Sequence, residues 1–423
     1  MTKCGTVKLA TGADLPLFGL GTWLSTDPAA LTTALKTAFD TGYRLIDTAY
    51  IYRNEAIIGQ LPLTAHKPDE VEEMVKKQLE DLQVDYFDLY LIHCPCPCKH
   101  RPEDTAEKYK LLLEDGHVVP ELVDHLETWK VLEKLHKEGI LKAIGLSNFN
   151  EEQIQNILDH ATVKPHNLQV EAHIYWPQKE LHEFCKKNNI TMTSYATLGS
   201  PGRAASIPDF YWPPGEPMKD PLVLQLAEKY KKSPAQICLK FYFAILLRHM
   251  IQRGICVIPK SINPDRVIEN FSIFDFKLTE EEIDQLDNVK TRVRLILIDV
   301  LFDHPWYPFK DVDLSKMKRH CQISTGTNLP LLELGTWKVK YAIEYYPSNI
   351  YRILSEQHLL KRCYPSNTTR AIFIKTMQLF NTFTNTNDAP PYGTDLTNRE
   401  FLIAARNTIK QFNKIFEQYT TNY

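Results

Sequence analysis

Apolar and polar positions along residues 1–310 repeat one unit: a short apolar run, a loop, an amphipathic segment and another apolar run. The apolar runs predict strands at residues 19–23, 43–47, 87–93, 141–147, 168–172, 190–195 and 254–260. Apolar residues at helical spacing predict helices at residues 28–41, 68–82, 122–138, 151–160 and 179–188. Strands that alternate with helices in this way indicate a parallel sheet with helices packed outside it.

Polar residues end most of these predicted strands. They are Asp47, His93, Ser147 with Asn148, Glu171 with Gln169 two positions before it, Tyr195 and Lys260. One polar strand end has an ordinary explanation as a satisfied core hydrogen bond, whereas six at the same end of a sheet are hard to explain by packing. The active site of a (β/α)8 TIM barrel lies at the C-terminal ends of its strands. No GxGxxG follows any predicted strand, as a doubly wound dinucleotide fold would require. The sequence therefore predicts an α/β TIM barrel with a catalytic site over residues 1–310.

Residues from 311 onward follow a different pattern. The segment CQISTGTNLPLLELGTWKVK (321–340) repeats VKLATGADLPLFGLGTWLST (7–26) almost position for position, and the repeat stops after Lys340. We interpret residues 311–340 as a linker and a truncated repeat of the barrel N-terminus, a tandem duplication. Residues 341–423 form a tail whose one strong element is a late helix, with Thr397 and Glu400 as its capping box. We expect this tail to be poorly ordered and without function, because one truncated repeat cannot bury its own apolar face.

Composition and charge narrow the function classes. The chain has 423 residues, 43% of them hydrophobic and 24% charged, as in an ordinary soluble globular protein. Its net charge of −3 argues against nucleic-acid and anionic-membrane binding. The first sixteen residues lack the apolar core of a secretory signal, and the longest apolar stretch is too short to cross a bilayer. Nine cysteines without disulfide-framework spacing suit a reducing compartment, so we expect a cytoplasmic protein.

The stretch LIHCPCPCKH (91–100) has two interpretations, a small metal site or the rim of a catalytic barrel. Zinc-binding cysteines are commonly spaced C-x2–4-C with a second ligand pair elsewhere, and no second pair exists in the sequence. Cysteines at alternate positions separated by prolines would also point their thiols in different directions. We therefore expect no metal, and we expect Cys94 to Cys98 to begin a loop over the substrate pocket with exposed thiols.

Six motifs carry a resemblance to a known family. They are GYRLIDTAYIYRNEAIIG (42–59), DLYLIHCP (88–95), IGLSNF (144–149), LQVEAHIY (168–175), SYATLGSPG (194–202) and VIPKSINPDRVIENF (257–271). In order and spacing they resemble the aldo-keto reductase family, over residues 5 to about 310. The resemblance implies NADPH-dependent reduction of aldehydes or ketones to alcohols without a metal, at the mouth of a TIM barrel. It also implies a small-molecule carbonyl substrate and a monomer.

The chemistry requires an acid, because hydride transfer to a carbonyl carbon leaves an alkoxide that must be protonated. The resemblance makes Tyr52 the proton donor and His93 the group that orients the carbonyl. A phenol with a pKa of about 10 donates slowly near neutral pH unless a nearby cation lowers that pKa. In the family this cation is a lysine paired with the aspartate that matches Asp47.

The resemblance also places the cofactor and the substrate. It assigns the nicotinamide carboxamide to Ser147, Asn148 and Gln169, and the ring stack to Tyr195. Further cofactor contacts are Leu198, Ser200, Lys260, Ser261, Arg266, Glu269 and Asn270, and the substrate pocket is lined by Trp23, Cys94 and Trp306. Asn263 and Pro264 predict a helix N-terminus, which favours phosphate. Lys260 and Arg266 add positive charge beside it, which suits the 2′-phosphate of NADPH and NADP+. We therefore expect NADPH to be preferred over NADH, which lacks this phosphate.

The chain departs from the family pattern where the catalytic lysine should lie. Gly59–Gln60 runs directly into LPLTAHKPDE (61–70), the stretch that normally follows a third strand ending in that lysine. Lys67 is the nearest lysine, but it lies at the approach to the next helix. CLKFYFAI (238–245) resembles an insertion, and Ala196 and Thr197 replace a serine and a proline of the pyrophosphate loop. We expect an incomplete barrel with impaired catalysis. One alternative is a catalytically inactive NADPH-binding or structural protein, and another is a sequence that gives no stable protein. The departures would suit either a gene model that spans two tandem genes or a decaying duplicate.

Overall fold

The computed structural model describes residues 4–47, 49, 60–101, 109, 111–114, 117–206, 212–230, 242–309 and 312, and structural statements refer to these residues. The chain divides into two compact units, Met1–Leu314 and Ser315–Tyr423. Tyr52, the truncated repeat at 321–340 and the tail with its late helix lie outside the described residues. The prediction that the tail is poorly ordered therefore stays a prediction.

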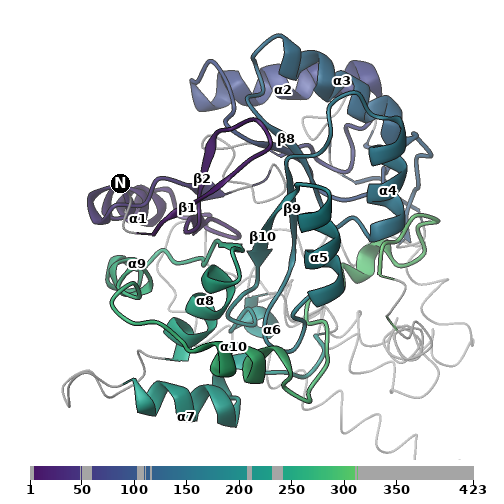
Figure 1. Ribbon diagram of the computed structural model, residues 1–423. Helices are drawn as coiled ribbons and strands as arrows, with labels where there is room; N and C mark the ends of the chain where they lie inside the picture. Colours follow the sequence, from purple (N-terminus) through teal and green to yellow (C-terminus); the bar gives the residue numbers. More distant parts are fainter. Residues whose placement is uncertain are drawn as a thin grey trace, which may run out of the picture. The chain divides into compact units, whose positions relative to one another are not determined.

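A parallel sheet forms the centre of the first unit (Figure 1). Its five-stranded part has the order β11 (Cys256–Val257), β10 (Thr191–Tyr195), β9 (Asn167–Glu171), β8 (Ile144–Ser147) and β5 (Tyr90–Ile92). The parallel pair β3 (Leu20–Gly21) and β4 (Ile46–Asp47) is joined to β11 by bridges from Phe18 to Val257 and from Gly21 to Lys260. At the other edge, Leu61 makes a parallel bridge to Ile92 of β5. The described strands thus run β4–β3–β11–β10–β9–β8–β5–Leu61, which confirms the predicted parallel α/β architecture.

Side-chain caps begin three of the five helices that the sequence predicts, α1 (Pro28–Thr41), α3 (His125–Lys137) and α4 (Glu151–His160). The other two are α2 (Pro68–Leu82) and α5 (Lys179–Lys187). Asp27 caps α1 by accepting from the backbone N–H groups of Ala29 and Ala30. Asn150 and Gln153 form a capping box at α4. Three of the five helices, α1, α2 and α4, have the predicted bounds, and the other two are shorter by one to four residues.

Other elements extend this frame. Two antiparallel hairpins are β1 (Thr6–Lys8) with β2 (Asp14–Pro16), and β6 (Leu113–Glu114) with β7 (His117–Val118). The remaining helices are α6 (Arg203–Ser206), α7 (Pro221–Lys229), α8 (Tyr242–Gln252), α9 (Pro264–Phe271) and α10 (Glu280–Asp287), with 3-10 turns at Pro217–Lys219 and Asp299–Leu301. Of the predicted insertion, residues 238–241 lie outside the described residues, and residues 242–245 form the start of α8.

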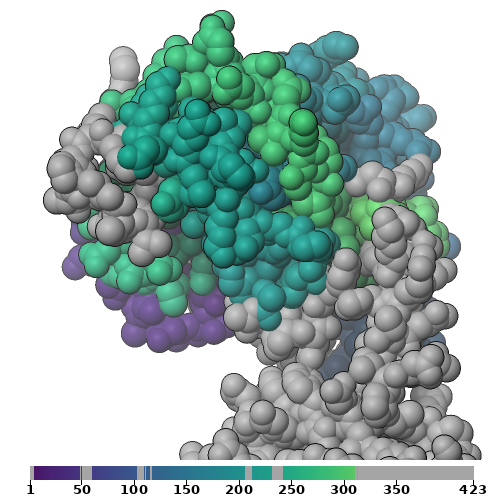
Figure 2. All heavy atoms as spheres, turned by 90° about the horizontal axis from the view of Figure 1, so that it is seen from below, coloured from purple at the N-terminus to yellow at the C-terminus, as the bar shows by residue number. Residues whose placement is uncertain are grey.

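Aromatic packing joins the N-terminal and C-terminal parts of this unit. Helices α1 and α9 lie side by side (Figure 1), and purple N-terminal residues border green residues from later in the chain in the space-filling view (Figure 2). Between them the rings of Tyr43 and Phe271 stack with centroids 4.8 Å apart, and Phe18 meets both rings edge-on. The buried Tyr43 hydroxyl donates to the backbone oxygen of Val267 at 2.8 Å, which satisfies its polar end.

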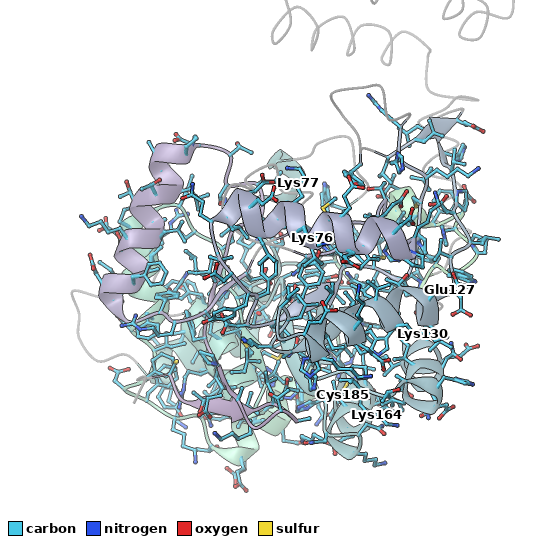
Figure 3. The ribbon with its side chains drawn as sticks, turned by 90° about the horizontal axis from the view of Figure 1, so that it is seen from above. Lys76, Lys77, Glu127, Lys130, Lys164 and Cys185 are labelled. Atoms are coloured by element: carbon cyan, nitrogen blue, oxygen red, sulfur yellow. The ribbon has the colours of Figure 1, made fainter. Side chains whose placement is uncertain are left out.

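The outer faces of the helices carry charged side chains. Figure 3 labels Lys76 and Lys77 on α2, and Glu127 and Lys130 on the neighbouring α3. Glu72 of α2 pairs with Lys76 at 2.9 Å. Exposed pairs of this kind contribute about 0–1 kcal/mol each, so the apolar faces of these helices supply most of their stability. Among the described residues, no helix is long and apolar enough to cross a membrane.

Candidate functional site

The strand register brings the predicted polar strand ends to one edge of the sheet. Gly21 pairs with Asp47 and bridges to Lys260. On the other side, Ser147 pairs with Gln169. The last residues of β9 and β10, Glu171 and Tyr195, pair with each other. His93 directly follows β5, whose last residue pairs with Leu146. The prediction that these ends converge is confirmed for all six.

Hydrogen bonds join several of these residues into one network. The Asn148 side-chain amide donates to the backbone oxygen of His93 at 2.9 Å, and Tyr195 donates its hydroxyl to Asn148 Oδ1 at 2.7 Å. Asn148 also reaches Ser147 Oγ at 3.2 Å, and its backbone has a φ of 64°, which asparagine tolerates better than most residues. Burial lowers the pKa of His93 to about 4. His93 is therefore a neutral imidazole near neutral pH, which can donate one hydrogen bond to a carbonyl oxygen.

Asp47 has two neutral amides as side-chain partners. Gln169 Nε2 donates to Asp47 Oδ1 at 2.7 Å, and Gln60 Nε2 donates to the same oxygen at 3.3 Å. Burial raises the pKa of Asp47 to about 6, although both hydrogen bonds act to lower it. Among the described residues, Asp47 makes no ion pair. Lys67 pairs instead with Glu121 at 2.7 Å and Glu70 at 3.5 Å, so it does not replace the lysine.

Gln60 is a site residue that the sequence analysis did not assign. It directly precedes Leu61, whose backbone N–H donates to the oxygen of Leu91 in β5 and whose oxygen accepts from the backbone N–H of His93, so its side chain is held beside the strand ends. The backbone oxygen of Gln60 also accepts from the buried side chain of Gln78. Gln60 is 3% exposed, and its buried Oε1 has no hydrogen-bond partner among the described residues. An unpaired buried amide oxygen costs about 1–3 kcal/mol, so Gln60 fits this position imperfectly. The sequence did contain a signal for this residue. Gln60 directly precedes residues 61–70, the stretch that follows the catalytic lysine in the family pattern.

The predicted phosphate end has the expected helix terminus. Asn263 caps α9 by accepting from the backbone N–H of Arg266 at 3.1 Å, and Pro264 is the first helical residue, as predicted. Lys260 and Arg266 are exposed, so both cations are accessible to an anion. Ser261 and Asn270 are buried and Glu269 is half-buried within the same strand–helix connection. The contacts assigned to these residues remain predictions.

The pyrophosphate loop is held by a hydrogen bond that its altered sequence supplies. Thr197 Oγ1 lies 2.6 Å from Ser194 Oγ, which also donates to the backbone oxygen of Ala172 at 2.7 Å. The half-buried Leu198 and Ser200 follow, and Ser200 has a φ of 48°. The threonine hydroxyl therefore stabilises the turn in which the family pattern has a proline.

The cysteines after β5 are buried, so the prediction that their thiols are exposed is wrong. Cys94, Cys96 and Cys98 are buried in an apolar cluster with Leu63, Leu301, Tyr307 and Phe309, so their thiols are not exposed as expected. Burial raises the pKa of the Cys98 thiol to about 12, which leaves it protonated and unreactive. No group of three His, Cys, Asp or Glu side chains could hold a metal ion within the described part of the chain.

Two aromatic residues complete the substrate side. Trp23 is half-buried directly after β3. Trp306 is half-buried, and its ring meets the ring of His125 with centroids 4.8 Å apart. His125 in turn bonds the backbone oxygen of Pro95 at 2.9 Å, which fixes Trp306 against the loop that begins at His93.

The residues present fit a nicotinamide dinucleotide in part. Asn148 and Tyr195 are preordered by their shared hydrogen bond, and the N-terminus of α9 with Lys260 and Arg266 suits a phosphate. Gln169, in contrast, directs its amide N–H to Asp47. Together, a parallel α/β sheet with polar strand ends at one edge is the arrangement in which barrel enzymes build their active sites.

Comparisons with known proteins identify the class. The sequence model described as Aldo/keto reductase family matches residues 17–291. Aldo-keto reductase family 1 member A1 of Gallus gallus is 40% identical over 341 positions, covering 73% of this chain and 98% of that protein. The Homo sapiens member of that name is 40% identical over 338 positions, covering 72% and 98%. The aldose reductase structure from Schistosoma japonicum matches with a TM-score of 0.62 at 35% identity, covering 72% of this chain and 99% of that one.

The fold and the site thus belong to an α/β TIM-barrel oxidoreductase. The chain is a member of the aldo/keto reductase family, whose enzymes are NADP-dependent oxidoreductases.

Proposed function

We propose that the first unit binds NADPH and reduces aldehydes or ketones to alcohols, at a rate lowered by the neutral partners of Asp47. The observation that carries the proposal is the hydrogen-bonded network of Asn148, Tyr195 and the His93 backbone at the edge where Asp47 and Gln169 also meet. Such a network preorders groups that would otherwise lose conformational freedom on binding. We further propose that the protein acts as a cytoplasmic monomer on a small-molecule carbonyl substrate.

Each residue has a defined part in this proposal. NADPH, when bound by these residues, would supply the hydride that reduces the carbonyl carbon. His93 donates a hydrogen bond to the carbonyl oxygen from its neutral ring, which stabilises the negative charge that develops there. Tyr52 donates its phenolic proton to the alkoxide that hydride transfer forms. Ser147, Asn148 and Tyr195 orient the nicotinamide, and Lys260 and Arg266 hold the 2′-phosphate, with Leu198, Ser200, Ser261, Glu269 and Asn270 along the remaining cofactor.

The incomplete barrel is part of the same proposal. Gly59–Gln60 runs directly into the stretch that follows the lysine-bearing strand in the family pattern, which supports a deletion before Leu61. Leu61 meets β5 through one bridge residue where the family pattern has a strand. The neutral Gln60 beside Asp47 favours a second candidate function, an NADPH-binding protein without turnover.

Steady-state assays separate the two functions. Purified full-length protein is mixed with NADPH and an aromatic aldehyde, and NADPH consumption is followed by its absorbance. The proposal expects turnover about tenfold or more below that of a relative with an intact lysine, and NADPH binding visible as quenched tryptophan fluorescence. Turnover equal to the intact relative would contradict the impaired-enzyme proposal. Quenching without any turnover would instead support the binding function.

A further inference from the structure

Glu171 is the last residue of β9, and the proposed reaction gives it no role. Its side chain is fully buried, which is costly for a carboxylate unless hydrogen bonds and charges compensate for the lost water. The backbone N–H of Leu295 donates to Oε1 at 2.6 Å, and that of Ile296 lies 3.2 and 3.1 Å from the two oxygens. His173 Nε2 bonds Oε1 at 2.8 Å. The carboxylate thus holds a segment that lies 124 residues further along the chain.

Arg294 places a positive charge beside this carboxylate. Its Nη1 lies 3.8 Å from Glu171 Oε2. The guanidinium also lies 4.7 Å from the ring centre of Trp176 and 3.9 Å from that of Phe309. Both cation–ring distances are within the range of attractive contacts. Arg294 therefore connects Glu171 to the two ends of residues 292–309, which we call the late loop.

The late loop is also tied to the loops after β5 and β8. His304 Nε2 bonds the backbone oxygen of Pro97 at 2.8 Å. Gln153 and Asn150, at the start of α4, donate to the backbone oxygens of Trp306 at 2.9 Å and Pro308 at 3.1 Å. Figure 1 draws part of this loop in green beside α4. The loop thus crosses the strand ends from β9 to β5, with Glu171 as its buried ionic anchor.

We infer that Glu171 is a positioning residue whose carboxylate sets the late loop, and with it Trp306, against the substrate side of the site. It determines which carbonyl compounds fit: large aromatic aldehydes contact the loop, whereas small aliphatic ones do not reach it. Only the substrate class in this inference rests on the proposed function. Glu171→Gln keeps the side-chain shape but removes the negative charge beside Arg294 and replaces one acceptor oxygen with an NH2 group. Ile296 then loses one of its two oxygen contacts, and the remaining neutral oxygen accepts more weakly than a carboxylate does.

A matched control exists on α10. Glu282 is 5% exposed and accepts from Lys229 at 2.6 Å and from the backbone N–H of Thr279 at 2.8 Å. Glu282→Gln therefore removes the same charge from another buried carboxylate without touching the late loop. Any effect shared by both variants reports general destabilisation.

The first measurement is hydrogen exchange of the amides in the late loop, which needs no turnover. We expect exchange at Leu295 and Ile296 to be at least tenfold faster in Glu171→Gln than in the wild-type chain, and unchanged in Glu282→Gln. Unchanged exchange in Glu171→Gln would overturn the inference whether or not the protein is an active enzyme.

The second measurement is aldehyde binding in the presence of NADP+, followed by tryptophan fluorescence. We expect Glu171→Gln to weaken naphthaldehyde binding about tenfold and propanal binding less than twofold. Equal weakening of both would mean that the residue is merely structural, and the inference would fail. A wild-type chain that binds naphthaldehyde but turns over nothing would contradict the proposed function and leave the positioning role in place.

Discussion

Gln60→Lys is the sharpest test of why this chain should be a slow enzyme. The substitution places an ammonium group near the point that Gln60 Nε2 occupies, 3.3 Å from Asp47 Oδ1. At that distance and an effective dielectric constant of about 20, the attraction between two unit charges is about 5 kcal/mol. Removing the lysine from water offsets several kcal/mol of this gain. The pKa of Asp47 should fall by about 1–3 units from its present value of about 6, equivalent to about 1.4–4 kcal/mol.

The new cation should also act on the proposed proton donor. A positive charge near Tyr52 lowers the pKa of its phenol, which makes proton transfer to an alkoxide faster near neutral pH. In steady-state assays with NADPH and an aromatic aldehyde, we expect kcat to rise about tenfold or more. The Kd for NADPH should also fall, because a lysine beside Asp47 should free the amide of Gln169, an assigned cofactor contact, from its 2.7 Å bond to Asp47.

Two control variants make this test specific. Gln60→Met keeps a side chain of similar length but brings no charge and no donor, so kcat should not rise. Adding Asp47→Asn to Gln60→Lys removes the anionic partner, and the gain should be lost. If Gln60→Lys leaves kcat unchanged, or if Gln60→Met raises it equally, the missing cation is not what limits turnover and the reasoning is refuted.

Three further outcomes test the site and the core. Because burial raises the pKa of Asp47 to about 6 from 3.8, the folded state binds this proton more tightly than the unfolded state. The free energy of unfolding should therefore fall by about 2–3 kcal/mol as pH rises from about 4 to about 7, a slope that urea titrations should find absent in Asp47→Asn. Tyr195→Phe removes the 2.7 Å hydrogen bond to Asn148, and fluorescence titration should show the Kd for NADPH rising about fivefold. An unchanged Kd would mean that this bond does not preorder the cofactor site. In Gly145→Ala the new Cβ would lie 2.4 Å from the backbone oxygen of Asn167, so urea unfolding should show a loss of about 2–3 kcal/mol. A smaller loss than 1 kcal/mol would mean that β8 and β9 can separate locally.

Helix bounds could be predicted from the sequence because their signals are local. Proline at the first helical position and a polar cap before it define the start of α1 within a few consecutive residues. Strand bounds were predicted less well. The apolar run at 43–47 predicts a five-residue strand, whereas β4 contains only Ile46–Asp47. A strand exists only where a neighbour pairs with it, and the partner of β4, Leu20–Gly21, lies some 25 residues away.

The meeting of the polar strand ends could be predicted for the same reason that the fold could. Polar residues at the ends of parallel strands must meet at one edge, whatever the lengths of the connecting helices. Their hydrogen-bond partners could not be predicted. Gln169 donates to Asp47 across 122 residues, and Glu171 donates nothing but accepts from a loop 124 residues later. Such choices depend on which donors face a buried oxygen, which no spacing in the sequence specifies.

The site departs from its family pattern in two ways, and both involve position 60. Asp47 has a neutral partner instead of a lysine, and Gln169 donates to Asp47. A carboxylate with a lysine partner would leave the amide of Gln169 available to a cofactor, because the cation alone would offset the burial of Asp47. With the neutral Gln60 at 3.3 Å, the Asp47 carboxylate instead takes the shorter bond, 2.7 Å, from Gln169. A buried anion gains more from a second donor when its first partner carries no charge. We therefore predict that Gln60→Lys frees Gln169 from Asp47 and supplies a cation to the proposed proton donor at the same time.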